Sequence, residues 1–299
     1  MTSFTKAWNS FFFAPGSARN FGICRLLFFG WLFLAYLSWD FTGWALVDDV
    51  FHRPISIQKY FSLAVPSADV LLVLQRIWKV SLLLSCLGLF TRLSTASSFL
   101  LGLYLCTIPH SHGKIHHWDA MLLMTMAVFM FSRCGDAMSL DTLLPWGKGV
   151  DHKRYGDAGE YTWPVRMPCC ILSIVMLAAG ISKIKGGPDW VGPTNLSVLL
   201  MQHQYLIANT DPWVMWGAKL STISWMCSMF ALGTIVFEAG FPIALFTRWG
   251  KWVFLPGSIL MFVSFRALLG PSFIEYIGSM YVFWINWDWV IGKFQKSPA

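Results

Sequence analysis

The sequence predicts an all-α integral membrane protein, a polytopic bundle of about eight transmembrane helices. Composition gives the first indication: of 299 residues, 56% are hydrophobic and 12% are charged, whereas soluble domains carry about 25% charged residues. The second indication is the abundance of aromatic residues, with 17 Trp and 25 Phe, because such rings gather at membrane interfaces. The third is that apolar residues form runs long enough to cross a bilayer. We therefore expect lipid to surround most of the chain.

The apolar segments follow one another along the chain as one predicted domain, residues 1–299. The predicted spans are residues 21–39, 70–90, 93–109, 117–132, 166–184, 222–246, 252–269 and 272–291. Before the first span, residues 1–19 carry a short apolar patch that Pro15 and Gly16 interrupt. This pattern predicts an interfacial helix. Helical spacing at residues 194–207 predicts a second helix along the interface.

The distribution of Lys and Arg predicts the orientation of the chain. Loops on the cytoplasmic side of a membrane carry an excess of these residues. The side that holds the N-terminus receives the larger set, namely Lys6, Arg19, Arg92, Arg133, Lys148, Lys153, Arg154, Arg166, Arg248, Lys251, Lys293 and Lys296. We therefore expect both termini in the cytoplasm, with His112 and Lys114 on the outer side. The net charge of +7 follows from this topology, and no nucleic-acid partner is expected.

Ionisable residues inside the predicted spans require an explanation, because a charge in the bilayer is costly. They include Arg25, Arg76, Lys79, Glu238 and Arg266. Such side chains normally face the bundle interior, where they either pair between helices or line a polar cavity. We expect Glu238 to face the interior and to pair with Arg25 or Arg76.

Histidines cluster before the fourth span. The cluster consists of His110, His112, His116 and His117, followed by Asp119. Imidazoles in this pattern can ligate a metal, but no second ligand group stands at a fixed spacing elsewhere, and no metal is expected. Because imidazole gains and loses protons near neutral pH, a polar catalytic or ligand-binding rim is the preferred interpretation.

The end of the fifth span reads Ala-Ala-Gly-Ile-Ser-Lys-Ile-Lys over residues 178–185. Its small residues allow helices to approach closely. Lys183 has two interpretations here. Its stem can carry the ammonium group to the lipid headgroups, which the spacing alone favours. Alternatively, partial burial disfavours the charged form, and the neutral amine then serves as a base.

The segment "AGISKIKGGPDW" at residues 179–190 resembles part of vitamin K-dependent gamma-carboxylase and its bacterial relatives, which share the horizontally transferred transmembrane domain (HTTM). Further similarities occur in the same order along residues 21–285: the early Arg25, "HHWDAMLL" from His116, "MSLDTLL" from Met138, His203, and "FEAGFPIALFTRWGK" around Glu238. The sequence departs from the family pattern at Ser182 and at Arg266, where the family has lysine and histidine.

The resemblance implies a membrane enzyme, in the bacterial cytoplasmic membrane, that carboxylates peptide glutamate with reduced vitamin K or another quinone. It implies that Lys183 is the base and that His117, or His116, is the catalytic histidine. It places Arg25, His203, Glu238 and Arg266 at the cofactor. We expect Lys183 and the histidines to converge on one outward-opening pocket that is apolar deeper down.

A second hypothesis comes from a different class of protein. The family enzyme grips its peptide with a large extramembrane portion that has no counterpart in this sequence. The chain would then be a non-catalytic membrane subunit or a maturation partner in a larger complex, surrounded by membrane lipid and other membrane-protein subunits. A transporter is less favoured, because the sequence shows no inverted repeat.

Overall fold

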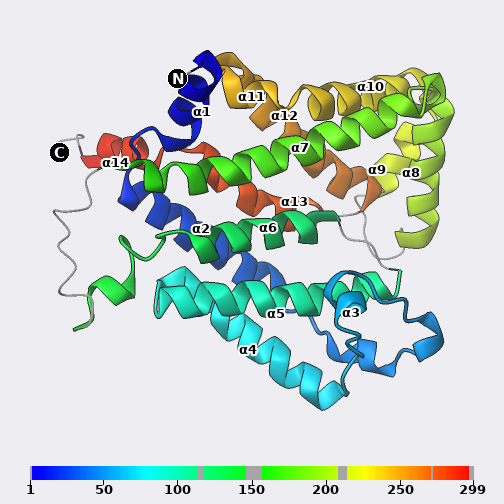
Figure 1. The fold of residues 1–299 in the computed structure, drawn as a ribbon. Helices are drawn as coiled ribbons and strands as arrows, with labels where there is room; N and C mark the ends of the chain where they lie inside the picture. Colours follow the sequence, from blue (N-terminus) through cyan, green and yellow to red (C-terminus); the bar gives the residue numbers. More distant parts are fainter. Residues whose placement is uncertain (1, 114–116, 146–156, 208–213, 271, 296–299) are drawn as a thin grey trace. The chain divides into compact units, whose positions relative to one another are not determined.

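The computed structural model describes residues 2–113, 117–145, 157–207, 214–270 and 272–295, and these residues form helices joined by turns, without a β-strand (Figure 1). The all-α prediction is confirmed for this part of the chain. Contacts group the residues into two compact units, which we describe separately. Unit 1 contains residues 1–168 and 282–299, and unit 2 contains residues 169–281. The single domain predicted from the sequence stays a prediction.

Four helices of unit 1, α2, α4, α5 and α6, pack in series. The longer helices of the unit are α1 (Ser3–Phe13), α2 (Ala18–Tyr36), α4 (Ala68–Leu87), α5 (Thr91–Ser111), α6 (His117–Phe131) and α14 (Trp287–Gln295), with the short η1 (Thr42–Leu46), η2 (Asp49–Phe51), α3 (Ser56–Tyr60), η3 (Leu140–Thr142) and η5 (Gly159–Tyr161) between them. Helix α4 packs against both α2 and α5, and α6 packs against α5 (Figure 1). The core of the unit is aromatic: Phe21, Phe28 and Phe29 of α2 surround Phe129 of α6, with ring centres 5.1–5.4 Å away.

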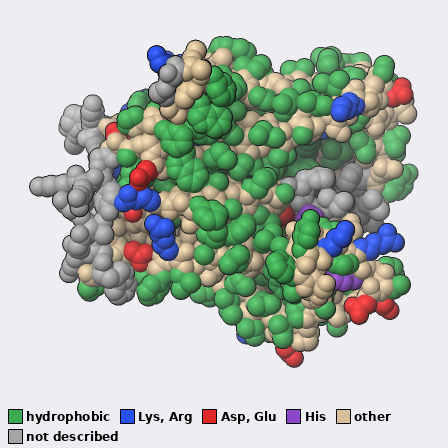
Figure 2. All heavy atoms as spheres, in the orientation of Figure 1, with side chains coloured by type: hydrophobic (Ala, Val, Ile, Leu, Met, Phe, Trp, Pro, Cys, Tyr) green, Lys and Arg blue, Asp and Glu red, His purple; other side chains and the backbone are tan. Residues whose placement is uncertain are grey.

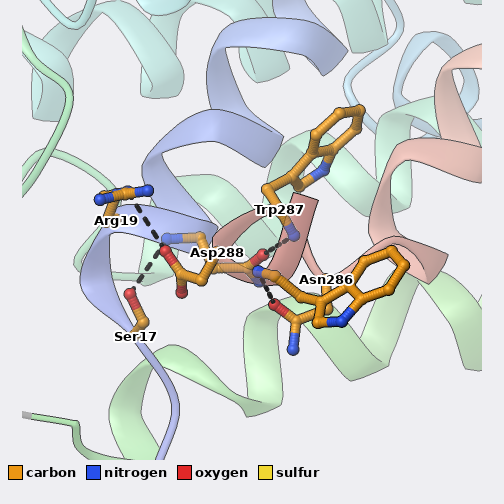
Figure 3. A network of polar contacts seen from close by, with 7 residues as sticks. Ser17, Arg19, Asn286, Trp287 and Asp288 are labelled. Atoms are coloured by element: carbon orange, nitrogen blue, oxygen red, sulfur yellow. Dashed lines mark hydrogen bonds and ion pairs between the residues drawn. The ribbon is translucent and has the colours of Figure 1, made fainter. Parts of the chain in front are cut away.

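A polar network joins the two ends of the chain within unit 1 (Figure 3). The Ser17 hydroxyl accepts from the amide of Asn20 and caps α2. The side-chain oxygen Oδ1 of Asn20 accepts from the backbone amide of Trp287, at 2.8 Å, and Arg19 Nε lies 3.2 Å from Asp288 Oδ1. These contacts hold the first turn of α14 against the first turn of α2.

Unit 2 contains the greater part of α7 (Trp163–Lys185) and the helices that follow it. These are η6 (Pro188–Trp190), α8 (Pro193–Ile207), α9 (Val214–Ser221), α10 (Ser224–Gly240), α11 (Ile243–Phe246), α12 (Arg248–Leu269) and α13 (Ile274–Ile277). Helix α8 packs against α9 and α10, and α12 packs against α9, α10 and α11. Gly180 brings α7 close to α10, because a Cβ there would lie 2.6 Å from the amide nitrogen of Ala239.

The prediction of about eight spans is not confirmed. Within the described residues, four helical segments are long and apolar enough to cross a membrane: Ala18–Tyr36, Ala68–Leu87, Gly159–Lys185 and Arg248–Leu269. The pair Met215–Ser221 and Ser224–Gly240, bent by 110°, gives a fifth if it is one span. Large apolar side chains such as Leu34 and Leu93 are about 70% exposed, and hydrophobic groups cover much of the visible surface (Figure 2). These features suit a membrane location.

The three remaining predicted spans contain helices, but none of them is a single helix that is both long and apolar enough to count as a membrane span. Residues 93–109 lie in α5, whose Ser and Thr side chains turn inward and lower its hydropathy. Of residues 117–132, His117–Phe131 form α6, which has 15 residues. Residues 272–291 do not form one α-helix, because they divide into α13, the 3₁₀ helix η7 (Gly278–Trp284) and the start of α14. Gly278 and the aromatic run after it have low helix propensity, which apolar composition alone does not reveal.

Candidate functional site

Lys183 and Glu238 form an ion pair in unit 2. Lys183 lies in the last turn of α7, and Glu238 lies near the end of α10. The nitrogen Nζ is 2.5 Å from Glu238 Oε2, and the side chains are 19% and 6% exposed. Nζ also lies 5.2 Å from the ring centre of Trp190. The pair forms because Gly180, one turn before Lys183, lets the two helices approach.

This geometry revises the sequence-based interpretation of both residues. Glu238 faces the interior and pairs with a basic side chain, as expected. The prediction that this partner is Arg25 or Arg76 is wrong, because the partner is Lys183. Sequence inspection could not select Lys183, because the two residues stand 55 positions apart without a shared motif. Lys183 is partly buried and paired, rather than extended alone to the headgroups. Nζ of Lys183 donates a hydrogen bond to Glu238 Oε2, so a proton can pass directly between the two groups.

An apolar pocket of about 250 Å³ lies among α8, α9, α10 and α12. Gly233, Thr234 and Phe237 of α10 form part of its wall. The hydroxyls of Thr234 and Ser264, which also line it, donate to carbonyl groups of their own helices. The pocket therefore presents a hydrocarbon lining. Glu238 follows Phe237 directly and lies one turn beyond Thr234, so that the ion pair and the pocket share the same segment of α10.

Arg25 has a structural position in unit 1. Its side chain is fully buried, its Nη1 donates to the carbonyl of Cys134 at 2.6 Å, and its Nη2 donates to the carbonyl of Met138. Gly88 leaves space for the guanidinium, since a Cβ there would meet Arg25 Nη2 at 2.6 Å. Arg76 is exposed on α4. Arg25 thus holds the loop that follows α6, and its predicted place at a cofactor stays a prediction.

The "MSLDTLL" segment also has a structural role within unit 1. The Ser139 hydroxyl donates to the carbonyl of Gly88, at 2.6 Å. Asp141 accepts from the amides of Phe90 and Thr91, both at 2.8 Å, and from the Thr91 hydroxyl. These contacts satisfy the first donors of α5, which that helix cannot satisfy itself. The segment therefore positions the start of α5.

The histidine cluster is only partly within the described side chains. His116 lies outside the described residues, and His117 begins α6 but its side chain is not among those described. The same applies to the side chain of His203 in α8. His110 Nε2 lies 3.1 Å from Asp119 Oδ2. Arg266 of α12 donates to the carbonyl of Gly270 at 3.3 Å.

The predicted convergence of Lys183 with the catalytic histidine stays a prediction, because Lys183 belongs to unit 2 and His117 to unit 1. Within the described residues, no group of three His, Cys, Asp or Glu side chains is arranged to hold a metal ion. Sequence inspection missed Trp190, whose ring lies near Lys183, and Tyr36, whose hydroxyl donates to Asp119 Oδ1 at 2.7 Å. Both are aromatic residues near helix ends, where membrane proteins carry many, so composition gives no signal that singles them out.

Comparisons with protein-family models, curated proteins and solved structures give no match. Glu238, which pairs with Lys183, follows on α10 the residues that line the apolar pocket, so one helix carries both a charged pair and a wall of the space for a ligand.

Proposed function

We propose that this chain is an integral membrane protein that binds a reduced quinone in unit 2 and supports carboxylase-type chemistry, with Lys183 as the base. The observation that carries the proposal is that Glu238, paired with Lys183 of α7, lies on the same segment of α10 as residues that line the apolar pocket. A quinone joins a polar ring to a hydrocarbon tail. An apolar pocket that has a small number of polar groups near one end suits such a molecule.

The residues supply proton handling in this proposal. A bound reduced quinone would offer an acidic hydroxyl whose deprotonation starts the reaction. Lys183 accepts that proton when its own proton has moved to Glu238, so that the pair gains one proton and changes its net charge by one. Trp190 shields one side of the ammonium group from water. Peptide glutamate, carbon dioxide and oxygen, which oxidises the reduced quinone, are the co-substrates that the resemblance implies, and they complete the proposed reaction.

The proposal includes the topology predicted from the sequence. It places about eight membrane-crossing segments in a bacterial cytoplasmic membrane with both termini in the cytoplasm. Labelling of single cysteines in intact cells tests the orientation. An impermeant thiol reagent should label a cysteine at position 112, and should not label one at Lys251. Lys148 and Lys153, the other cytoplasmic markers, lie outside the described residues.

A non-catalytic membrane subunit is the second candidate function. The specific observation in its favour is that Glu238 already satisfies the ammonium group of Lys183 at 2.5 Å. Such a pair can simply hold α7 against α10, and the pocket then accommodates a structural lipid. This candidate predicts that loss of Lys183 weakens assembly or folding without removing any quinone-dependent reaction.

An activity measurement separates the two candidates. Purified protein in lipid nanodiscs would receive vitamin K hydroquinone, oxygen, labelled carbon dioxide and a glutamate-containing peptide, with label in the peptide as the readout. Lys183→Met should abolish incorporation. Lys219→Met is the matched control, because Lys219 also lies over an indole, that of Trp216 at 4.7 Å, but is exposed on α9. Equal incorporation by both variants, or none by the unaltered protein, would favour the subunit.

A further inference from the structure

A small polar pocket lies within unit 1, where α5 begins and α6 ends. Its volume is about 170 Å³. Thr91, Arg92 and Thr95 of α5 form one part of its wall, and residues 132–136, which follow α6, form another together with Asp141. Hydroxyl and charged groups therefore surround this space, in contrast to the hydrocarbon lining of the pocket in unit 2.

The charged residues of the wall balance one another. They are two arginines, Arg92 and Arg133, and two aspartates, Asp136 and Asp141. Asp141 accepts three hydrogen bonds at the start of α5. Arg133 lies between two carboxylates, 2.8 Å from Asp136 and 2.7 Å from Glu160. A wall with equal numbers of positive and negative groups suits a zwitterion better than a simple anion or a simple cation.

Arg92 and Asp136 provide the groups that can hold the two charges of a zwitterion. Within the described residues, no carboxylate pairs with the exposed guanidinium of Arg92. Asp136 uses Oδ2 for its contacts with Arg133 and with the Tyr161 hydroxyl, so that Oδ1 can accept a further hydrogen bond. A guanidinium matches the geometry of a phosphate group, and a carboxylate accepts strong hydrogen bonds from an ammonium group.

The wall also indicates which kind of ammonium group it fits. None of the lining residues among those described is aromatic, whereas a quaternary ammonium group is usually held by aromatic rings. The hydroxyl of Ser132 donates to the carbonyl of Phe129, and its oxygen can still accept a hydrogen bond. Acceptors without aromatic rings favour a primary ammonium group, which has N–H donors.

Exposed apolar side chains adjoin the polar wall and indicate a lipid. Leu93, which follows Arg92, is 69% exposed, and Phe131, which precedes Ser132, is 72% exposed. The chain enters α5 through residues 88–90, directly after α4, which is long and apolar enough to cross a membrane. Lipid headgroups lie at the ends of such helices. A phospholipid can therefore place its headgroup in the pocket and its acyl chains against the apolar side chains.

We propose that this pocket binds the headgroup of a zwitterionic phospholipid with a primary ammonium group, the phosphatidylethanolamine class. Arg92 donates to the phosphate, and Asp136 and the Ser132 hydroxyl oxygen accept from the ammonium group. The bound lipid connects the start of α5 with the end of α6. This site lies in unit 1 and does not rest on the function proposed for unit 2.

Native mass spectrometry of the delipidated full chain in detergent tests the site. The probes are phosphatidylethanolamine, phosphatidylcholine and phosphatidylglycerol with the same acyl chains. Phosphatidylethanolamine should be retained about fivefold more than either of the others, because it alone combines the phosphate with N–H donors. Equal retention of the three lipids, or a preference for phosphatidylglycerol, would overturn the proposal.

Two variants connect this preference to the pocket. Arg92→Gln should lower phosphatidylethanolamine binding about fivefold, and Asp136→Asn should lower it to the level of phosphatidylcholine. Arg248→Gln is the matched control, because Arg248 is also an exposed arginine at the start of a helix, α12. Equal binding by Arg92→Gln and Arg248→Gln would overturn the proposal, and this comparison decides the matter even if Asp136→Asn fails to fold.

A soluble probe separates a lipid from a free zwitterion. Phosphoethanolamine carries the same two charges without acyl chains, so it should bind roughly tenfold more weakly than the phospholipid, since it buries no apolar surface. Displacement of bound phosphatidylethanolamine by an equal concentration of phosphoethanolamine would overturn the assignment to a lipid.

Discussion

The nitrogen Nζ of Lys183 lies 2.5 Å from Glu238 Oε2, and this ion pair joins α7 to α10 within unit 2. The pair explains how these two partly or largely buried charges are tolerated between apolar helices. It also decides which proton transfers are available, because a paired lysine is a base only when its partner can hold the proton. The proposed quinone chemistry and the subunit alternative both depend on it.

Loss of one partner of this pair should be strongly destabilising. In Lys183→Met, Glu238 stays buried without its cation, and we expect the free energy of unfolding to fall by roughly 3–5 kcal/mol. The double variant Lys183→Met with Glu238→Gln removes both charges and should recover most of the loss. Unfolding in mixed detergent micelles measures both effects. Additive losses in the double variant would show that the two residues do not interact.

Filling the apolar pocket should stabilise the protein. A Cβ at Gly233 would meet no atom within 4 Å, so Leu fits there without a backbone clash. Gly233→Leu should raise the free energy of unfolding by about 1 kcal/mol through helix propensity, and by more where the side chain fills the pocket. Gly292→Leu in α14 is the matched control, since its Cβ also enters open space. The two variants would show equal gains if Gly233 faced no pocket.

Asp141 should contribute to stability as an external cap of α5. Asp141→Ala removes the acceptor for the amides of Phe90 and Thr91, and lost caps cost about 0.5–2 kcal/mol. Asp141→Asn, which keeps one acceptor oxygen, should lose less. Thermal unfolding followed by circular dichroism provides the comparison. An unchanged midpoint in Asp141→Ala would show that water replaces the carboxylate fully.

Asp40 should make stability depend on pH in the acid range. Hydrogen bonds from the Thr42 amide, then from the Thr42 hydroxyl and Gln75, lower the pKa of this carboxyl, which lies between α2 and η1. A lowered folded-state pKa stabilises the protein above the unfolded-state value near 4, and the contribution disappears as pH falls through the folded-state pKa. The stability difference between the unaltered protein and Asp40→Asn should therefore shrink between pH 5 and pH 2. A difference that grows with acidity would contradict this assignment.

The sequence predicts the helices better than it predicts their partners. Apolar runs identify α2, α4, α7 and α12, because length and hydropathy are local properties. The segment 272–291 has a suitable composition but divides into three pieces, since a 3₁₀ run depends on local packing. The interfacial prediction for 194–207 yields a helix, α8, and its position in a membrane stays a prediction.

At the candidate site, the sequence does not predict which groups the charged residues contact. The charge of Arg25 suggests an acidic partner, but its partners are the carbonyls of Cys134 and Met138. A backbone carbonyl occurs at every residue and leaves no mark in the sequence. Likewise, the 55-residue separation between Lys183 and Glu238 hides their contact until α7 and α10 pack. Residue type predicted that these positions need partners, and only the fold identifies those partners.

The binding of a reduced quinone tests the central claim most directly. A photoreactive vitamin K analogue, reduced and added to the protein in nanodiscs, should crosslink to peptides of α10 or α12. The crosslink should fall at least tenfold in Gly233→Leu, which fills the pocket, and should persist in Gly292→Leu. Equal crosslinking in both variants, or crosslinks confined to unit 1, would contradict the assignment of a quinone to the pocket beside Lys183 and Glu238.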